Sequence, residues 1–428
     1  MRNEQPLSRM TMALSLCLLL TGSAQARVAG GMAEPYAIAQ QRAPVDVAAL
    51  PGLDWLDQQA AGLDKQLEET RFRVRSGLST AYIWNANDPF TGTSSLRPLS
   101  NNADDISIEL FQAELGWNPQ PAAGTFGANI KLDAGRIARQ LKADWNGTGV
   151  VPDSDWEPKD IELQEAWIAY TAPLGLGLTV RAGRLTTLLG AEVPEPWLNK
   201  NFSRSFLYGY ALPHTHTGGY ATYQLTEMIA LTAGAVVGWD NVQDNNATPS
   251  AIGQLAIQPN EKFRLYVSGI IGPEQTCAPK PGAGAPLYGE GCTANQRGVI
   301  DVVIGMTPLP GLDLVLNYDY GSESKASLTE VGQHATWSGF SGVASYTRGR
   351  WQGALRGEWF QDAAATRTGT KQTLWALTLD AKAMLSDLFY LRGEYRHDES
   401  DQAVFAASMP GTYHRGQDTI AIELGYEF

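Results

Sequence analysis

The residue types that could do chemistry gather in one stretch of the sequence, where Ser203 and Ser205 precede His214 and His216. A serine hydrolase needs a histidine base, an acid that orients the base, and donors for the oxyanion. Two histidines spaced two apart share one face of a strand, but a zinc site needs at least a third protein ligand. Neither an orienting acid nor a third ligand is identifiable nearby. We therefore predict no catalytic site and no metal, and expect these histidines to form hydrogen bonds at the mouth of a strand.

A second charged pattern is an arginine ladder, in which Arg71, Arg73 and Arg75 alternate with Phe72 and Val74. Alternation with a period of two places the three cations on one face of a strand. Each cation would cost roughly 2–4 kcal/mol in lipid near the bilayer midplane, so this face must meet water. The ladder then belongs either to a salt-bridge lattice that only holds shape or to a device that selects solutes. The sequence leaves both readings open.

The strand pattern that positions these residues is clearest at the end of the chain. Ile420, Ile422, Leu424, Tyr426 and Phe428 fall on one face, and polar or small residues fall on the other. Such alternation indicates a strand with one apolar and one polar face. A terminal aromatic pair suits the closing strand of an outer-membrane barrel, where it lies in an interfacial girdle. The same alternation continues back to residue 71.

The connections between these strands alternate between short turns and long polar loops. Counting strands between them gives about sixteen, an even number that leaves both termini on the periplasmic side. The pattern predicts an all-β fold, a transmembrane antiparallel up-and-down β-barrel spanning residues 71–428. A soluble β-sandwich would need neither this asymmetry of loop lengths nor so wide an apolar outer face. The alternation slips at residues 106–117 and 337–346, where we expect bulges.

The N-terminal region precedes the barrel pattern. Residues 1–26 have two arginines, a leucine-rich core and an Ala24-Gln25-Ala26 cleavage site, which is typical of a secretory signal peptide. Residues 27–70 are expected to form a periplasmic linker and a short helix that begins near residue 53. The helix spans too few heptads to predict a trimeric coiled coil, so a periplasmic or plug-like helix is favoured.

Composition narrows the remaining possibilities. The formal net charge of −13 makes nucleic-acid binding a poor expectation. After the signal peptide, no apolar run is long enough for a membrane-spanning helix. Cys277 and Cys292 then remain as a pair inside one long loop of an exported chain, and we expect a disulfide between them.

Residues 181–246 hold a series of short motifs in a characteristic order. They are Arg181-Ala182-Gly183-Arg184, Leu189-Gly190-Ala191-Glu192, the run from Asn201 to Tyr210, Pro213-His214-Thr215-His216-Thr217-Gly218, and the run from Gly238 to Asn246. This series resembles the beta-barrel porin-2 family, also called OmpL-like, of Gram-negative outer membranes. The resemblance implies a porin, with no enzymatic activity and no cofactor.

From this resemblance and the barrel pattern we expect a channel in the cell outer membrane for passive diffusion of small hydrophilic solutes and ions. The alternative is a structural or surface-binding barrel, adhesin-like or receptor-like, whose lumen is blocked. The expected partners are outer-membrane lipid, the solutes, and the barrel-assembly machinery acting through Phe428. The sequence does not decide between a monomer and a homotrimer, because a trimer contact and a lipid face are both apolar.

The long connection at residues 186–213 is too apolar for a surface loop, since exposed apolar area of this size is costly in water. We expect it to fold into the lumen and to form a constriction, with acids facing wall cations across a narrow opening. The alternative places its aromatic residues in a trimer or lipid-interface belt. The residues expected to line the pore are Arg71, Arg73, Arg75, Arg181, Glu192, Glu195, Arg204, Arg356, Arg392 and Arg396.

Overall fold

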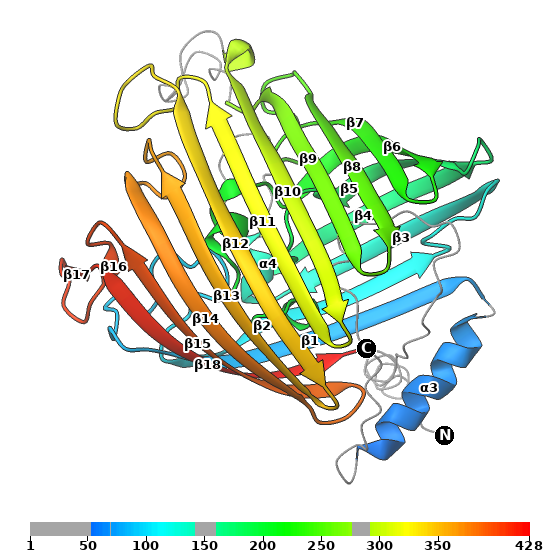
Figure 1. Ribbon diagram of the computed structural model, residues 1–428, viewed down its shortest axis with the longest axis horizontal. Coiled ribbons are helices and arrows are strands. Elements are labelled where there is room, and N and C mark those ends of the chain that lie inside the picture. Colours follow the sequence, from blue (N-terminus) through cyan, green and yellow to red (C-terminus); the bar gives the residue numbers. More distant parts are fainter. Residues whose placement is uncertain (1–52, 69, 142–159, 276–291) are drawn as a thin grey trace, which may run out of the picture.

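The computed structural model describes residues 53–68, 70–141, 160–275 and 292–428. Sixteen long strands of these residues form one closed antiparallel barrel (Figure 1). Their bounds are β1 (Phe72–Asn85), β2 (Asp105–Trp117), β3 (Thr125–Ala134), β4 (Ile161–Ala172), β5 (Leu178–Thr186), β6 (Thr215–Thr226), β7 (Ile229–Val236), β8 (Ser250–Asn260), β9 (Phe263–Pro273), β10 (Gln296–Leu309), β11 (Leu312–Glu323), β12 (Ala335–Arg348), β13 (Trp351–Asp362), β14 (Gln372–Met384), β15 (Phe389–Ser400) and β18 (Gly416–Glu427).

Each barrel strand pairs with the strand that follows it in the barrel, and β1 pairs with β18 to close the cylinder. The closing register runs from Gly77 opposite Glu427 to Asn85 opposite Thr419. A closed barrel leaves no free strand edge, which a β-structure in lipid requires. The predicted up-and-down barrel of about sixteen strands is therefore confirmed.

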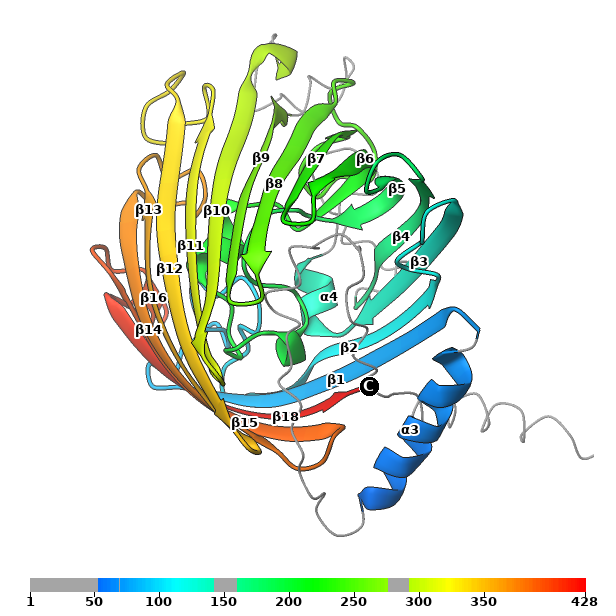
Figure 2. The same cartoon turned by 45° about the vertical axis from the view of Figure 1, so that its right-hand side comes forward.

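The connections at the two ends of the barrel differ in length. One end carries the tight connections, such as residues 227–228, 261–262, 310–311 and 349–350. The other end carries the long loops, of which the third, residues 187–214, is called L3 below. The last long loop contains a small hairpin, β16 (Phe405–Ala406) paired with β17 (Tyr413–His414). This arrangement leaves both ends of the barrel chain at the end with the short turns (Figures 1 and 2).

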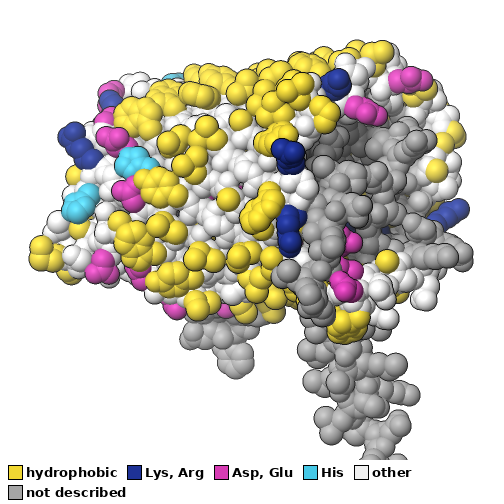
Figure 3. Space-filling view, turned by 60° about the horizontal axis from the view of Figure 1, so that its bottom comes forward, with side chains coloured by type: hydrophobic (Ala, Val, Ile, Leu, Met, Phe, Trp, Pro, Cys, Tyr) yellow, Lys and Arg dark blue, Asp and Glu magenta, His cyan; other side chains and the backbone are white. Residues whose placement is uncertain are grey.

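The two faces of the wall follow the alternation of the sequence. On β14 and β15 the outward residues, such as Leu377 and Leu391, are exposed, and the inward residues, such as Arg392 and Glu394, are buried. Figure 3 shows hydrophobic side chains spread over the outer wall, with many of the charged side chains near its edges. An apolar outer band and a polar interior are what a barrel in lipid requires.

Of the two bulges predicted from the sequence, one is present in the barrel. Between β1 and β2 the pairing shifts at Ser79/Thr80, so that Glu109 is an extra residue on β2 and the expected bulge is confirmed there. The bulge expected in β12 is wrong, because β12 pairs with β11 and β13 residue by residue along its length. Its small inward residues, Gly339 and Ser341, weaken the alternation in the sequence without interrupting the ladder.

One helix of the described residues lies outside the barrel. Helix α3 (Asp54–Glu68) packs Ala60 against Tyr426 and Phe428 at the end of the closing strand (Figure 2). The other helical pieces are short: α4 (Arg136–Gln140), η1 (Pro196–Leu198), η2 (Leu207–Ala211) and η3 (Cys292–Ala294). No helix in the described parts of the chain is long and apolar enough to cross a membrane.

Some expectations fall on residues outside those described. They are the signal peptide at residues 1–26, the linker from residue 27 to the start of the helix, and the disulfide, since Cys277 belongs to residues 276–291.

Candidate functional site: the loop inside the barrel

L3 leaves β5 and turns into the barrel. Leu188 and Leu189 lie in one apolar cluster with Val236, Ile252, Ile270 and Val299 on the inner faces of β7 to β10. Phe206 and Leu207, further along the same loop, lie in the same cluster, which extends to Trp337, Phe360 and Leu374 on β12 to β14. Phe202 of L3 packs in a different cluster, with Ala81 and Ile83 on β1 and Ala421 on β18, so the loop crosses the lumen. Burial of these apolar side chains is the driving force that the sequence pattern predicted.

The first anchor of L3 is the turn at residues 188–191. The carbonyl oxygen of Leu188 accepts hydrogen bonds from Gln254 Nε2 at 2.8 Å and from Ser268 Oγ at 3.0 Å. The Ala191 amide donates to Asn317 Oδ1 at 3.3 Å. Gly190, with φ of 88°, occupies the backbone region that favours glycine. The turn is thereby fixed to β8, β9 and β11.

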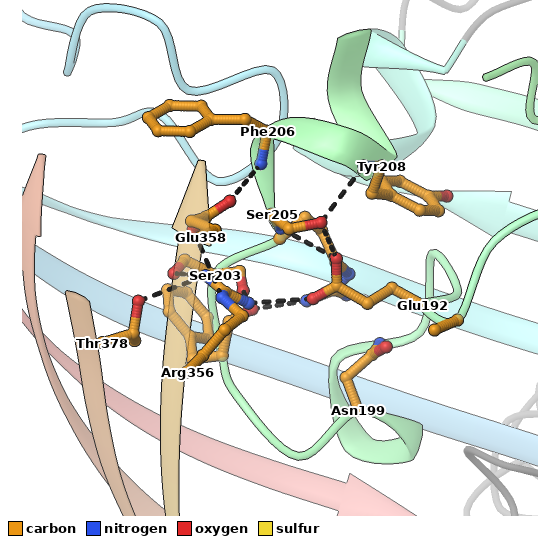
Figure 4. A network of polar contacts seen from close by, with 12 residues as sticks. Glu192, Asn199, Ser203, Ser205, Phe206, Tyr208, Arg356, Glu358 and Thr378 are labelled. Atoms are coloured by element: carbon orange, nitrogen blue, oxygen red, sulfur yellow. Dashed lines mark hydrogen bonds and ion pairs between the residues drawn. The ribbon is translucent and has the colours of Figure 1, made fainter. Parts of the chain in front are cut away.

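The second anchor is a polar network between L3 and β13 (Figure 4). Arg356 Nη1 donates to Glu192 Oε1 at 2.8 Å and to the Ser203 carbonyl oxygen at 2.6 Å. Glu192 in turn accepts from the Ser205 amide and hydroxyl, so one carboxylate connects the loop to the wall and to itself. The Arg356 side chain is fully buried. Breaking such a buried arginine–carboxylate pair is costly, because it leaves the other charge buried without a partner.

Wall carboxylates also bind the backbone of L3. Phe206 N donates to Glu358 Oε2 at 2.6 Å, and Ser203 N donates to both oxygens of Glu394. Buried amide groups must find acceptors, and a loop inside a barrel lacks the ladder partners of a strand. These inward carboxylates supply that need and hold the loop at a fixed depth.

The two inward arginines of β15 lie on the same surface of L3. Arg392 donates from Nη1 to the Pro196 carbonyl oxygen at 3.2 Å, and its Nε lies 3.3 Å from Glu423 Oε2. Arg396 donates to the Arg204 carbonyl oxygen at 2.6 Å and to Asp398 Oδ1 at 2.6 Å. Both arginines are buried, so their charges are balanced by neighbours in contact.

The side of L3 facing β1 to β3 is held in a similar way. Glu195 accepts from Gln112 Nε2 at 2.9 Å and from Lys131 Nζ at 3.1 Å. The ring of Trp197 lies over Gly77, where any Cβ atom would overlap the indole. L3 therefore has contacts on most of the circumference of the lumen.

Arg204 differs from the expectation that it faces wall charges across an opening. Its guanidinium donates to the carbonyl oxygens of Val193, Pro194 and Phe202, all within L3. Burial lowers the pKa of Arg204, and the nearby Glu192 carboxylate opposes that shift. Arg204 thus stabilises the fold of L3 itself and does not connect the loop to the wall.

Of the arginines expected to point into the lumen from β1 and β5, not all belong to a barrel strand. Arg71 does not: it precedes β1 with a φ of 63°, and its side chain is exposed, because the strand begins at Phe72. Arg73 and Arg75 lie on β1, and Arg73 Nη2 is 2.5 Å from Glu114 Oε1. Arg181 is inward on β5, with its guanidinium 4.1 Å from the Trp167 ring centroid.

These contacts correct the expectation of acids and bases separated by an opening. Glu192 touches Arg356, and Glu195 touches Lys131, so the charges of L3 and of the wall meet in ion pairs. The physical reason is the depth to which L3 penetrates, which is set by two of its apolar clusters, one with β7 to β10 and β12 to β14 and one with β1 and β18.

The serines and histidines singled out in the sequence form hydrogen bonds that hold L3 and the strand ends beside it. Ser203 Oγ accepts from Arg356 Nη2 and Arg396 Nη1, both at 3.2 Å, and Ser205 bonds to Glu192. His216 bonds through its two ring nitrogens to the Gly238 carbonyl oxygen and to Thr187 Oγ1. Within the described residues no group of three metal-ligating side chains is present.

Several residues that hold L3 were not among those expected from the sequence. They are Lys131, Glu358, Glu394 and Asp380, of which Asp380 accepts from the Phe202 amide of L3 at 3.2 Å. All four occupy inward positions of strands whose alternation was recognised. Their inward direction was therefore available from the period-two pattern. Their partners were not, because these depend on the path of L3.

Residues 71–428 match the family model described as "Putative beta-barrel porin-2, OmpL-like", and the chain belongs to that family. The fold and the family together define the class of this protein, an outer-membrane β-barrel of a porin-like family. A separate match to the membrane-bound lytic murein transglycosylase F of Haemophilus influenzae strain PittGG is 35% identical over 120 residues. It covers 25% of this chain and 23% of that protein.

Solved porin structures have the same fold at low sequence identity. OprB of Pseudomonas putida matches with a TM-score of 0.57 and 10% identity, over 91% of this chain and 100% of that one. The outer-membrane channel DcaP of Acinetobacter baumannii matches with a TM-score of 0.54 and 9% identity, over 83% and 97%. The anion-selective porin of Comamonas acidovorans matches with a TM-score of 0.51 and 11% identity, over 83% and 99%.

Proposed function

We propose that this porin allows passive diffusion of small hydrophilic solutes and ions along a narrow path beside L3. The observation that carries the proposal is the polar interior of the barrel combined with a loop that narrows it at a fixed depth. A barrel of sixteen strands encloses an aqueous lumen unless something fills it. The ion pairs of L3 with the wall, such as Glu192 with Arg356, keep the loop from moving freely in that lumen.

Passage would be limited by size more than by charge. Glu192, Glu195, Arg356 and Arg392 each have an oppositely charged partner, so the constriction offers little uncompensated charge to a passing ion. We therefore expect a small single-channel conductance with weak ion selectivity. The pore-lining role of the expected residues is part of this proposal, with Arg71 left out.

A blocked lumen is the second candidate, and the depth of L3 favours it. Arg356, Arg392 and Arg396 are at most 1% exposed, although they point inward from the wall. In that case the long loops would act at the surface as an adhesin or receptor, and the barrel would be a scaffold.

Single-channel recording in planar bilayers separates the two candidates. Stepwise conductance from the folded, heat-modifiable protein supports diffusion. Folded protein that inserts and gives no steps supports the blocked barrel. A parallel liposome-swelling assay with sugars of increasing size then measures the cutoff, which we expect to be small because L3 contacts so much of the wall.

The other partners belong to the same proposal. The apolar outer wall would contact outer-membrane lipid, and Phe428 would present the closing strand to the barrel-assembly machinery. We propose removal of the signal peptide so that the mature chain begins at Arg27. A homotrimer is also proposed, since OmpT of Vibrio cholerae, whose structure is similar, is described in a trimer form. Chemical crosslinking in membranes, followed by mass measurement, tests the assembly and the mature N-terminus.

A further inference from the structure

Two aspartates beneath L3 have no role in the network described above. Asp301 on β10 and Asp319 on β11 are cross-strand partners, and both point inward. Both are fully buried. Directly opposed side chains on neighbouring antiparallel strands have Cβ atoms about 4.5–5.5 Å apart, so the two carboxyls face each other. They are also within hydrogen-bonding reach of one another.

The contact between the two carboxyls has no donor of its own. Asn317 Nδ2 donates to Asp301 Oδ1 at 2.7 Å. The Gly190 amide of L3 lies close to the same carboxyl. Asp301 Oδ2 and both oxygens of Asp319 have no aligned donor among the described residues. An ionised carboxylate only accepts hydrogen bonds, so a bond between two carboxyls requires a proton on one of them.

Among the described residues, no cation balances the pair. β8 carries no charged inward residue, and the charge on β12 is Arg348 at its far end. On β9 the charged residue is Arg264, four positions from Ser268, which is the partner of Asp301. The other charged groups on β10, β11, β13 and the nearby part of L3 have their own partners. These are Arg297 with Glu323, Lys200 with Asp313, Glu192 and Glu358 with Arg356, and Asp362 with the amides of Thr366, Arg367 and Thr368. Two buried carboxyls in contact without a cation cannot both ionise.

We propose that Asp301 and Asp319 form a proton-binding site that controls L3. With one shared proton, one carboxyl is neutral and the other is ionised, and the turn at residues 188–191 packs over both. Loss of that proton places two like charges in contact inside the lumen. The proposal goes beyond diffusion itself and gives the channel a dependence on pH.

The link from the pair to the loop runs through Asn317. Its side-chain nitrogen donates to Asp301 Oδ1, and its side-chain oxygen accepts from the Ala191 amide. The Gly190 amide of the same turn lies close to the Asp301 carboxyl. Two bare carboxylates can be solvated only by water, and water can reach them only if the turn that covers them moves. Deprotonation therefore loosens the first anchor of L3, while the second anchor at Arg356 stays in place.

The experiment records conductance in planar bilayers over a pH series, and its conductance arm rests on the proposed function. We expect the wild-type conductance to rise through one single-proton transition as the pH increases. Asp319→Asn keeps a permanent N–H donor to Asp301, so this variant should stay at the low-pH conductance throughout. Glu330→Gln, at an exposed loop residue, is the matched control and should keep the wild-type transition. An unchanged transition in Asp319→Asn would overturn the proposal.

A second readout does not depend on conduction. Infrared difference spectra of the folded wild type should contain the C=O band of a protonated carboxyl, which disappears as the pH rises. That band should be absent from Asp319→Asn and from Asp301→Asn, either of which serves if the other fails to fold. A folded protein that never conducts would refute diffusion while the band still decides the proton site. A band that persists in both variants would exclude this pair as its source.

Discussion

Replacing Arg356 by alanine is the most direct test of how L3 is held. The side chain is fully buried and joins β13 to Glu192, Ser203 and Thr378. Its removal leaves the carboxylates of Glu192 and Glu358 inside the lumen without this partner. Removing one partner of a buried ion pair costs about 3–5 kcal/mol.

The substitution should destabilise the seated position of L3 and not the barrel, because the backbone hydrogen bonds between the strands do not involve this side chain. At roughly 1.4 kcal/mol for each factor of ten, the equilibrium between a loosened and a seated L3 shifts by about two to three and a half orders of magnitude. The Ser205 and Phe206 amides, which bond to Glu192 and Glu358, should lose protection against hydrogen exchange by a similar factor.

Hydrogen exchange measured by mass spectrometry in detergent or nanodiscs is the assay. Arg348→Ala, at an exposed residue near the end of β12, is the control and should leave L3 protection unchanged. A cycle with Glu192→Ala separates the pair from the rest of the site, since the double variant should lose less than the sum of the two single ones. Unchanged protection of Ser205 and Phe206 in Arg356→Ala would refute the reasoning.

Three further predictions concern other parts of the chain. Gly77→Val should displace Trp197 and change the conductance, since a Cβ there overlaps the indole, whereas Gly357→Ala, whose Cβ meets nothing within 4 Å, should leave the conductance unchanged. Deleting Phe428 should reduce membrane assembly more than secretion, because its backbone bonds to Ser76 and its ring packs against α3; normal yields of heat-modifiable protein would contradict this. The Cys277–Cys292 disulfide should stabilise its loop by roughly 3 kcal/mol in the chain-entropy model, and free thiols at both positions in the mature protein would count against it.

The barrel could be predicted from the sequence alone. Strand alternation is a local property, and a period of two assigns each residue to lipid or lumen without knowledge of its partner. The alternation of short and long connections indicated the strand number and the side of the termini. The apolar residues of L3 also predicted that this loop leaves the aqueous surface, since exposed area of that size is unfavourable.

Which charges meet could be learned only from the folded chain. Glu192 and Arg356 are 164 positions apart, and their contact depends on the depth at which L3 packs against both sides of the wall. The same depth turned Arg204 onto the carbonyl groups of its own loop and left Asp301 and Asp319 covered by the turn at residues 188–191. Alternation gives the direction of a side chain, whereas the pairing of buried charges is settled by packing between segments distant in the sequence.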